Sequence, residues 1–377
     1  NDPAIFALAL AASFGDLDTR RYALSKLKAV ARIPTHLYHF DEFCKGLRGW
    51  GSTMVRAHQD WLESFTVDQL AYQAVKYQQR DGWSMRDVLR KSHPKSTDHN
   101  PVRNNIYKWI VDGYQDIWHQ GSAVPEIITG FEEAKECVEP HKLVKLIQQY
   151  GLTREMIPTK ALKHAEVWEA LLEKMPYTAM LRNLGNMSKV GLLKPLSDAA
   201  KLVQQRLVDP ALLKKARVHP YALLLASKTY AQGHGLLGKG EWTVVPKVVD
   251  AINDAFYLAF DYLEPTNKRF LVGVDVSGSM SSSCISSGQR SKNGQPIPGP
   301  ISAAEGAAAM ALALAKVEPE CYIHGFTSGT GGYQFYGSKS KNDTLGFVDL
   351  GITQQMRLPN DLAATRKNNF GATDCAV

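Results

Sequence analysis

The sequence predicts a protein of two parts, an α-solenoid of short helices followed by an α/β domain that is truncated here. Three observations indicate this fold class. Apolar residues recur at three- and four-residue spacing up to about residue 264, β-rich apolar runs begin only at Arg269, and Pro265-Thr266-Asn267 separates the two patterns. We therefore place the domains at residues 1–266 and 267–377.

The first part consists of amphipathic helices separated by turn signals such as Gly49-Trp50-Gly51, Asp81-Gly82 and Gly233-His234-Gly235. Short helices in series bury their apolar faces on one another, which is typical of a solenoid. No strict period is visible, so the repeats are degenerate. The pattern predicts helices at residues 5–12, 24–31, 55–63, 67–77, 102–114, 140–150, 167–174, 177–184, 196–207, 221–232 and 245–263.

The second part alternates strands with a helix. Residues 269–276 form an apolar, β-rich run that predicts a buried parallel strand, and residues 281–300 form a polar insert. An Ala-rich helix at 303–317, a strand at 321–326 and a third strand at 344–350 complete the start of an α/β sheet. We expect about half of this domain to lie beyond the sequence.

Composition narrows the class of protein. The net charge is +7 and the pI about 9.0, which favours an anionic partner. No apolar run is long enough to cross a bilayer, and no signal peptide is visible. The five cysteines are scattered and form no CxxC pair, which argues against a disulfide framework or a zinc module and predicts a cytoplasmic location.

A D-x-S-x-S motif follows the first strand of the second part. Asp275, Ser277 and Ser279 present a carboxylate and two hydroxyls at the carboxyl end of that strand, where open α/β sheets bind ligands. Thr373, in a Gly-Ala-Thr turn about a hundred residues later, supplies another hydroxyl. Hard oxygens of this kind suit Mg²⁺ or another divalent cation.

Other interpretations of the motif were considered. A polar turn that caps the next helix is the simplest alternative. An aspartyl-phosphate phosphatase requires a second Asp at the position of Ser277, and a nucleophile elbow requires Gly at the position of Asp275. Both enzyme classes fail, and no catalytic constellation emerges elsewhere, so we predict that the chain is not an enzyme.

Basic residues gather between positions 76 and 108. Lys76 and Arg80 are four residues apart, as are Arg86 and Arg90 on the next predicted helix, which His93 closes. Guanidinium groups bind phosphates and histidine stacks on unpaired bases, so the stretch predicts an RNA-binding surface. A solvated helix face is the alternative, and Trp83 in the intervening turn is better explained as a core anchor.

Several of these motifs, in this order, resemble the family of Ro 60 kDa (TROVE-domain) RNA-binding proteins. The resemblance extends over essentially the whole chain. Its segments are KYQQRDGWS at 76–84 with Ser92-His93, RGWG at 48–51, REMIPT at 154–159, MPYTAMLRNLG at 175–185, VHP at 218–220, GHG at 233–235, and the stretch from EPT at 264–266 to DVS at 275–277.

The resemblance implies a ring of HEAT-like repeats closed by a von Willebrand A domain. It further implies binding of Y-type small noncoding RNA and of single-stranded 3′ ends of misfolded RNA, with an exoribonuclease as partner in RNA quality control. The protein would be a monomer in a ribonucleoprotein. The family's RNA-contact positions correspond to Lys76, Arg80 and His93, and its metal positions to Asp275, Ser277, Ser279 and Thr373.

A second hypothesis of a different class remains open. The metal turn is also suited to a cation-dependent adhesion module, in which the bound ion grips a carboxylate of a protein partner. Phosphate contacts weaken with salt, whereas a chelated carboxylate is released by EDTA. These two responses distinguish the RNA-binding hypothesis from the adhesion hypothesis.

Overall fold

The computed structural model describes residues 2–95, 100–113, 123–235, 240–290, 295–327 and 347–367, and the chain divides into two compact units, residues 1–173 and 174–377. Apart from a two-stranded hairpin at residues 79–84, which was not predicted, secondary structure changes from helical to mixed at Arg269, as predicted. The division into compact units falls earlier, within the helical region, so the predicted domain boundary at residues 266 and 267 stays a prediction. The expected closure into a ring also stays a prediction.

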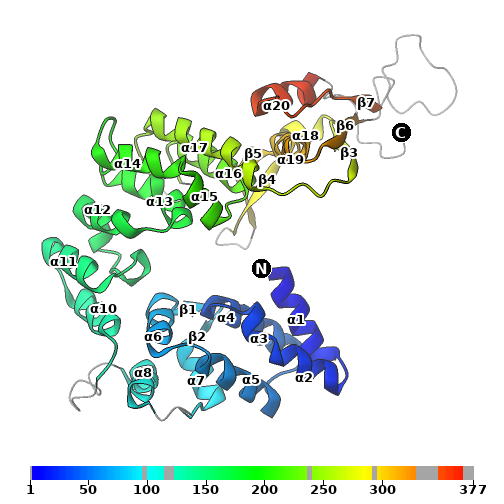
Figure 1. The fold of residues 1–377 in the computed structure, drawn as a ribbon. Helices are drawn as coiled ribbons and strands as arrows, with labels where there is room; N and C mark the ends of the chain where they lie inside the picture. The colour runs from blue at the N-terminus through cyan, green and yellow to red at the C-terminus, as the bar shows by residue number, and fades with distance from the viewer. Residues whose placement is uncertain are drawn as a thin grey trace, which may run out of the picture. The chain divides into compact units, whose positions relative to one another are not determined.

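The first unit is built of helices that pack on one another in series (Figure 1). Apolar side chains such as Leu37, Phe40, Trp61 and Leu70 are fully buried between them. Its helices are α1 (Asp2–Phe14), α2 (Leu17–Ser25), α3 (Leu27–Val30), α4 (Pro34–Leu47), α5 (Ser52–Glu63), α6 (Val67–Lys76), α7 (Met85–Ser92), α8 (Pro101–Asp112), α10 (Glu126–Glu136), α11 (Pro140–Tyr150) and α12 (Ala165–Lys174), with 3₁₀ turns η1 (Arg154–Met156) and η2 (Ala161–Lys163).

Three helices of this unit, α2, α4 and α10, were not predicted, since the helix predicted at 24–31 overlaps α2 only at its last two residues. Helix α4 carries Asp41 on its buried side, which interrupts the apolar pattern. Helix α10 contains Gly130, a residue that usually weakens helices. A β-carbon on Gly130 would lie 2.3 Å from the ring of Tyr150 in α11. The glycine therefore serves close packing of two helices, a tertiary reason that the local sequence does not reveal.

A short hairpin interrupts the helices. Strands β1 (Gln79–Arg80) and β2 (Trp83–Ser84) pair antiparallel, with Arg80 opposite Trp83. The sequence predicted the Asp81-Gly82 turn but not the two strands. The hairpin packs against α4 and leads directly into α7.

The second unit begins with further helices and ends in a mixed sheet (Figure 1). Its helix α15 was not predicted, and α17 is shorter than expected because a 3₁₀ turn takes its end. The helical elements are α13 (Tyr177–Lys189), α14 (Asp198–Leu207), α15 (Pro210–Ala216), α16 (Pro220–Ala231), α17 (Pro246–Leu258) and η3 (Ala259–Tyr262).

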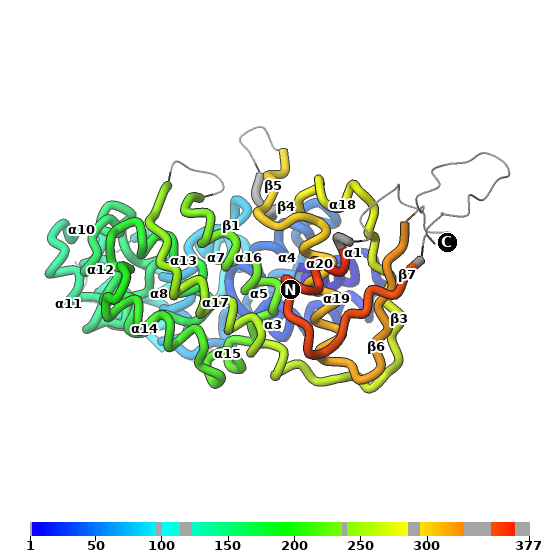
Figure 2. Tube along the Cα trace, turned by 90° about the horizontal axis from the view of Figure 1, so that it is seen from above, coloured from blue at the N-terminus to red at the C-terminus, as the bar shows by residue number. Residues whose placement is uncertain are grey.

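The sheet has the strand order β3-β6-β7. Strand β3 (Arg269–Asp275) runs parallel to β6 (Glu320–Phe326), and β7 (Phe347–Asp349) pairs antiparallel with β6. Helix α19 (Ala303–Val317) packs against β3 and β6, and α20 (Leu358–Lys367) packs on α19 (Figure 2). This βαβ unit confirms the predicted strand, Ala-rich helix and strand, whereas α20 was not predicted.

The prediction of a buried first strand was wrong. Leu271 and Tyr322 face each other across the pair β3–β6, and they are 71% and 57% exposed. Helix α19 covers one face of these strands, and no other described helix covers the face that carries Leu271. An apolar run therefore marked the strand correctly but overstated its burial.

The polar insert contains two strands that were not predicted. Strands β4 (Cys284–Arg290) and β5 (Pro296–Ser302) form an antiparallel hairpin that follows the short helix α18 (Ser279–Ser282). Register shifts along the pair mark irregular β structure. No helix in the described residues is long and apolar enough to cross a membrane.

Candidate nucleic-acid interface

The hairpin is a tight two-residue turn. Asp81 and Gly82 have φ values of 53° and 77°, in the left-handed region that such hairpin turns require. Glycine adopts this region freely, and Asp tolerates it better than most residues. His39 of α4 holds the Asp81 carboxylate, with Nδ1 2.5 Å from Oδ2. The turn therefore presents Arg80 on an exposed strand that is anchored to α4.

Helix α7 carries an exposed row of basic side chains. Ser84 and Asp87 form a reciprocal capping box that fixes its start. Arg86, Arg90 and His93 follow at positions i, i+4 and i+7, and all three are exposed. This spacing places Arg86 and Arg90 on one face of the helix, and His93 caps its end in the left-handed conformation. We call these three residues the α7 strip.

The two guanidinium charges of the α7 strip are not neutralised by the protein. Within the described ranges, neither Arg86 nor Arg90 has a carboxylate at ion-pair distance. Lysines elsewhere differ, because Lys142 pairs with Glu139 and Lys201 with Asp198, each at 2.9 Å. The α7 strip therefore offers free guanidinium donors to an anion.

Lys76 is held differently from the α7 strip. It is half-buried at the end of α6, where its Nζ donates to the Tyr72 hydroxyl at 3.0 Å and lies over the Tyr72 and Tyr77 rings. Burial lowers the pKa of Lys76, but the Tyr72 hydrogen bond and the nearby charges of Tyr77, Tyr72 and Glu155 outweigh it and raise the pKa overall. The ammonium therefore stays charged.

The predicted site residues thus lie on three consecutive elements. Lys76 ends α6, Arg80 lies in the hairpin, and the α7 strip follows. Helix α7 packs mainly on α5 and α8, and the Gln59 side chain of α5 donates to the Ser92 carbonyl at 2.7 Å, next to His93. The Lys76 side chain has other neighbours. The five residues are therefore close in sequence, but they are not held in place by the same packing contacts.

One member of the basic stretch has a purely structural role. Arg103 of α8 is buried, and its guanidinium donates to the carbonyls of Leu62 and Phe65 at 3.3 and 2.9 Å. It thereby satisfies carbonyl groups at and just beyond the end of α5. Counting basic residues along the sequence overestimated the exposed charge for this reason.

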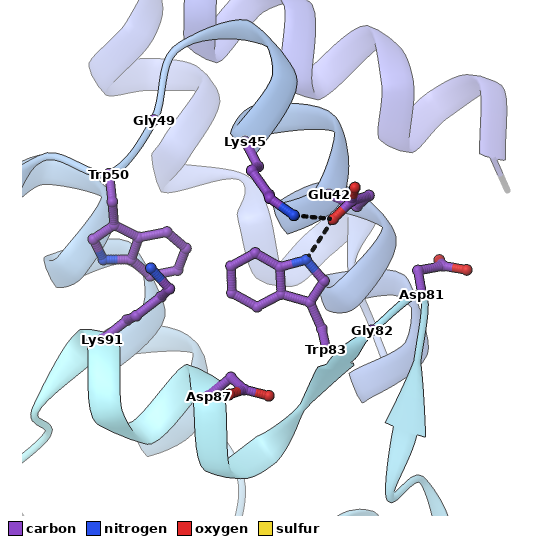
Figure 3. A pocket seen from close by; sticks show the side chains of 9 residues that line it. All are labelled: Glu42, Lys45, Gly49, Trp50, Asp81, Gly82, Trp83, Asp87 and Lys91. Carbon is purple, nitrogen blue, oxygen red and sulfur yellow. Dashed lines mark hydrogen bonds and ion pairs between the residues drawn. The ribbon is translucent and has the colours of Figure 1, made fainter.

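A pocket beside the hairpin was missed by the sequence analysis (Figure 3). It has a volume of about 350 Å³, and the rings of Trp50 and Trp83 stand 5.9 Å apart at 19°. Lys91 of α7 reaches toward both rings. The pocket, here called the tryptophan pocket, is lined by Glu42, Lys45, Gly49, Trp50, Asp81, Gly82, Trp83, Asp87 and Lys91.

Trp83 is the core anchor that we predicted, since it is buried and its Nε1 donates to Glu42 at 2.8 Å. The available signal for the pocket was the Gly-Trp-Gly triplet around Trp50, which sequence analysis treated only as a turn. The triplet lies about 30 residues before Trp83, so only the fold brings the two rings together.

A buried pair lies behind Trp50. His58 and Asp41 are both 0% exposed, and His58 Nε2 lies 2.7 Å from Asp41 Oδ1. His58 Nδ1 lies 2.8 Å from the Met54 carbonyl, and the Trp50 ring packs on the imidazole with centroids 4.5 Å apart. Burial raises the pKa of Asp41, which the His58 interaction partly opposes. The pair supports one wall of the tryptophan pocket.

The D-x-S-x-S turn follows β3 as predicted. Asp275 Oδ1 accepts from the Ser277 backbone N–H at 2.8 Å, and the hydroxyls of Ser277 and Ser279 lie 3.2 Å apart. The three side chains therefore gather oxygens on one turn, which fits part of a Mg²⁺ site. Thr373, the fourth predicted ligand, lies outside the described residues. The described residues contain no group of three or more His, Cys, Asp or Glu suited to a metal.

These features define a class of protein, a chain of helical repeats joined to a von Willebrand A-type domain with a D-x-S-x-S turn. Comparisons with known proteins narrow this class. Residues 1–150 and 141–234 match the TROVE domain, and residues 269–377 match the Ro60 vWA domain. The chain belongs to the TROVE family of Ro60 proteins.

The chain is similar to two proteins named RNA-binding protein RO60. It is 38% identical to the one from Deinococcus radiodurans over 100% of this chain and 65% of the relative. It is 31% identical to the one from Caenorhabditis elegans over 94% of this chain and 59% of the relative. The chain thus spans less than two thirds of the length of these relatives.

A solved structure resembles the chain as well. The crystal structure of the Deinococcus radiodurans RO (RSR) protein matches with a TM-score of 0.76 and 37% identity, covering 99% of this chain and 68% of that chain. The predicted fold class, a helical region followed by a von Willebrand A-like domain, is confirmed.

Proposed function

We propose that the chain binds RNA through the α7 strip together with Arg80 and Lys76. The observation that carries the proposal is the pair of exposed guanidinium groups of Arg86 and Arg90 on one face of α7, neither of which has a carboxylate at ion-pair distance in the described ranges. Guanidinium groups bind phosphate oxygens in a fork geometry, and they do so best where no carboxylate competes. The relatives named as RNA-binding proteins support the same function.

We further propose the ligands that the family resemblance implies. These are Y-like small noncoding RNA at the basic surface and single-stranded 3′ ends of misfolded RNA, in quality control with an exoribonuclease. We propose a cytoplasmic protein without catalytic activity of its own, monomeric within its ribonucleoprotein. Support comes from the excess positive charge and from the family match.

The test compares two pairs of substitutions with a matched control. Arg86→Ala with Arg90→Ala, and Lys76→Ala with Arg80→Ala, each remove two charges from the proposed surface. Lys142→Ala with Lys201→Ala removes two exposed, paired charges on other helices, α11 and α14. Since Arg80 Nε lies 3.6 Å from Asp81 Oδ1, this control is matched most directly to Arg86→Ala with Arg90→Ala. Binding of a stem-loop RNA with a single-stranded 3′ tail is measured across a salt series, with circular dichroism to verify folding.

Each lost phosphate contact flattens the slope of log affinity against log salt by about 0.7 to 0.9. We expect both surface pairs to lower the affinity severalfold or more and to flatten the slope by more than one. The control pair changes the slope less. Equal slopes for all three folded variants and the unaltered chain would contradict the assignment of this surface.

A second candidate function rests on the oxygens gathered at Asp275, Ser277 and Ser279. We propose that these residues hold Mg²⁺ or another divalent cation, which would supply a coordination position for a carboxylate of a protein partner. Ser277→Ala with Ser279→Ala should abolish Mg²⁺ binding measured by calorimetry. Protein capture that survives both EDTA and this substitution would exclude the adhesion hypothesis.

A further inference from the structure

The tryptophan pocket lies beside the proposed RNA surface, and nothing above assigns it a ligand. Both stand on the same short segment, because Trp83 pairs with Arg80 across the hairpin and Lys91 follows Arg90 on α7. The volume of about 350 Å³ is at the lower end for sites that bind small molecules, roughly 300–1,000 Å³. A single planar ring is therefore a better match than an extended molecule.

The walls of the pocket are suited to a flat aromatic group. The Lys91 ammonium lies 5.3 Å from the Trp50 ring centroid and 5.6 Å from the Trp83 ring centroid. The position of the Lys91 ammonium shows that the space next to the two rings accepts a polar group (Figure 3). Lys45 brings a second positive charge. A cationic ligand would be repelled by both lysines, so a neutral aromatic ring is favoured.

Charge also determines which part of a nucleotide would enter. The carboxylates of Glu42, Asp81 and Asp87 line the pocket and repel a phosphate. The Arg90 side chain, next to Lys91 on α7, is exposed and attracts one. A nucleotide at this place would therefore keep its phosphate over α7 and direct its base onto the tryptophan rings.

Polar groups in the pocket can recognise the edge of a base. Glu42 accepts from Trp83 Nε1 and is near Lys45 Nζ at 3.6 Å, and its carboxylate has further lone pairs for an N–H group.

We propose that the tryptophan pocket binds one unpaired nucleobase of the RNA that the α7 strip holds by its phosphates. The base stacks on the Trp50 and Trp83 rings, and the Lys91 ammonium moves from the rings to the adjoining phosphate. The proposal rests on the proposed RNA binding. Stacking of one base on aromatic side chains changes affinity by roughly five- to a hundredfold on substitution by alanine.

The experiment scans one RNA for the base that enters the pocket. The RNA is a stem-loop with an unpaired loop and a 3′ tail, and each unpaired nucleotide is replaced in turn by an abasic one. The unaltered chain should lose roughly five- to a hundredfold in affinity at one position of the RNA. Trp50→Leu should lower the affinity for the intact RNA by a similar factor. For the Trp50→Leu variant, the abasic substitution at that position should then cause no further loss of affinity.

Control variants separate stacking from folding. Trp50→Phe keeps an aromatic face and should retain most of the affinity. Trp242→Leu alters a tryptophan of the second unit and should leave the response to abasic positions unchanged. Thermal melts followed by circular dichroism verify that each variant is folded.

The outcomes are distinct. Trp50→Leu could lower the affinity equally for the intact RNA and for every abasic RNA. This result would mean that Trp50 acts only through the fold. The pocket proposal would then be overturned, while the proposed RNA binding stands. Salt-sensitive binding with no sensitive position in the RNA would overturn it as well. Failure of the unaltered chain to bind any of these RNAs would overturn both proposals.

Discussion

Replacing Asp41 tests how the wall of the tryptophan pocket is supported. Both Asp41 and His58 are fully buried, and each ring nitrogen of His58 faces an acceptor or a carboxyl group. Asp41→Ala leaves Nε2 of His58 buried without a partner and opens a small cavity. Breaking a buried pair from one side costs about 3–5 kcal/mol. Asp41→Asn keeps a hydrogen-bonding group of the same size and should cost about 1 kcal/mol.

The free energy of unfolding is measured by urea titration with far-UV circular dichroism, and the Trp50 environment by near-UV circular dichroism. Because the chain has two compact units, we expect the change in the transition that reports on residues 1–173. The reasoning is refuted if Asp41→Ala costs less than 1 kcal/mol, or if Asp41→Asn costs as much as Asp41→Ala. The first result would show that the hydrogen bond to His58 contributes little, and the second that the amide of Asn does not replace the carboxyl group.

Two further predictions concern other parts of the chain. Gly130→Ala places a β-carbon 2.3 Å from the Tyr150 ring. It should lower the free energy of unfolding by about 1–3 kcal/mol, although alanine has the better helix propensity. A higher melting temperature of the variant would contradict the packing argument. Burial raises the pKa of Asp361 to about 7 from 3.8, so the folded state favours the neutral acid and stability falls as pH rises from about 4 to 7. Asp361→Asn should remove this fall. Its free energy of unfolding, relative to that of the unaltered chain, should therefore be higher at pH 8 than at pH 4 by at most about 4 kcal/mol. Urea titrations that give parallel stability–pH curves for the two proteins would exclude the prediction.

Regular elements with a clear pattern could be predicted from the sequence. Helix α11 was predicted at its observed bounds, and so was α19, because each has strong periodicity or high helix propensity between turn signals. Helix α10 was missed because Gly130 makes sense only against Tyr150. Local patterns report what the chain favours by itself, whereas close packing between helices depends on partners far along the chain.

The candidate site was predictable to a lesser degree. Exposure of Arg86 and Arg90 follows from the helical spacing, and the Asp81-Gly82 turn follows from its residue types. The tryptophan pocket could not be predicted, because α4 and the hairpin must pack before Trp50 meets Trp83. The burial of Arg103 is likewise a tertiary effect that a count of charges cannot detect.

The two-residue turn of the hairpin sets a limit on how this segment can change. A hairpin of this kind fixes which strand residues face each other, and shifting the register by one residue sends every side chain to the opposite face. One residue inserted between Asp81 and Gly82 would therefore move Trp83 away from Trp50 and alter the start of α7 together. The segment can accept new side chains at exposed positions, but its length is fixed. Arg80 and the tryptophan pocket therefore keep a constant separation. A ligand that contacts both must have two groups separated by that distance.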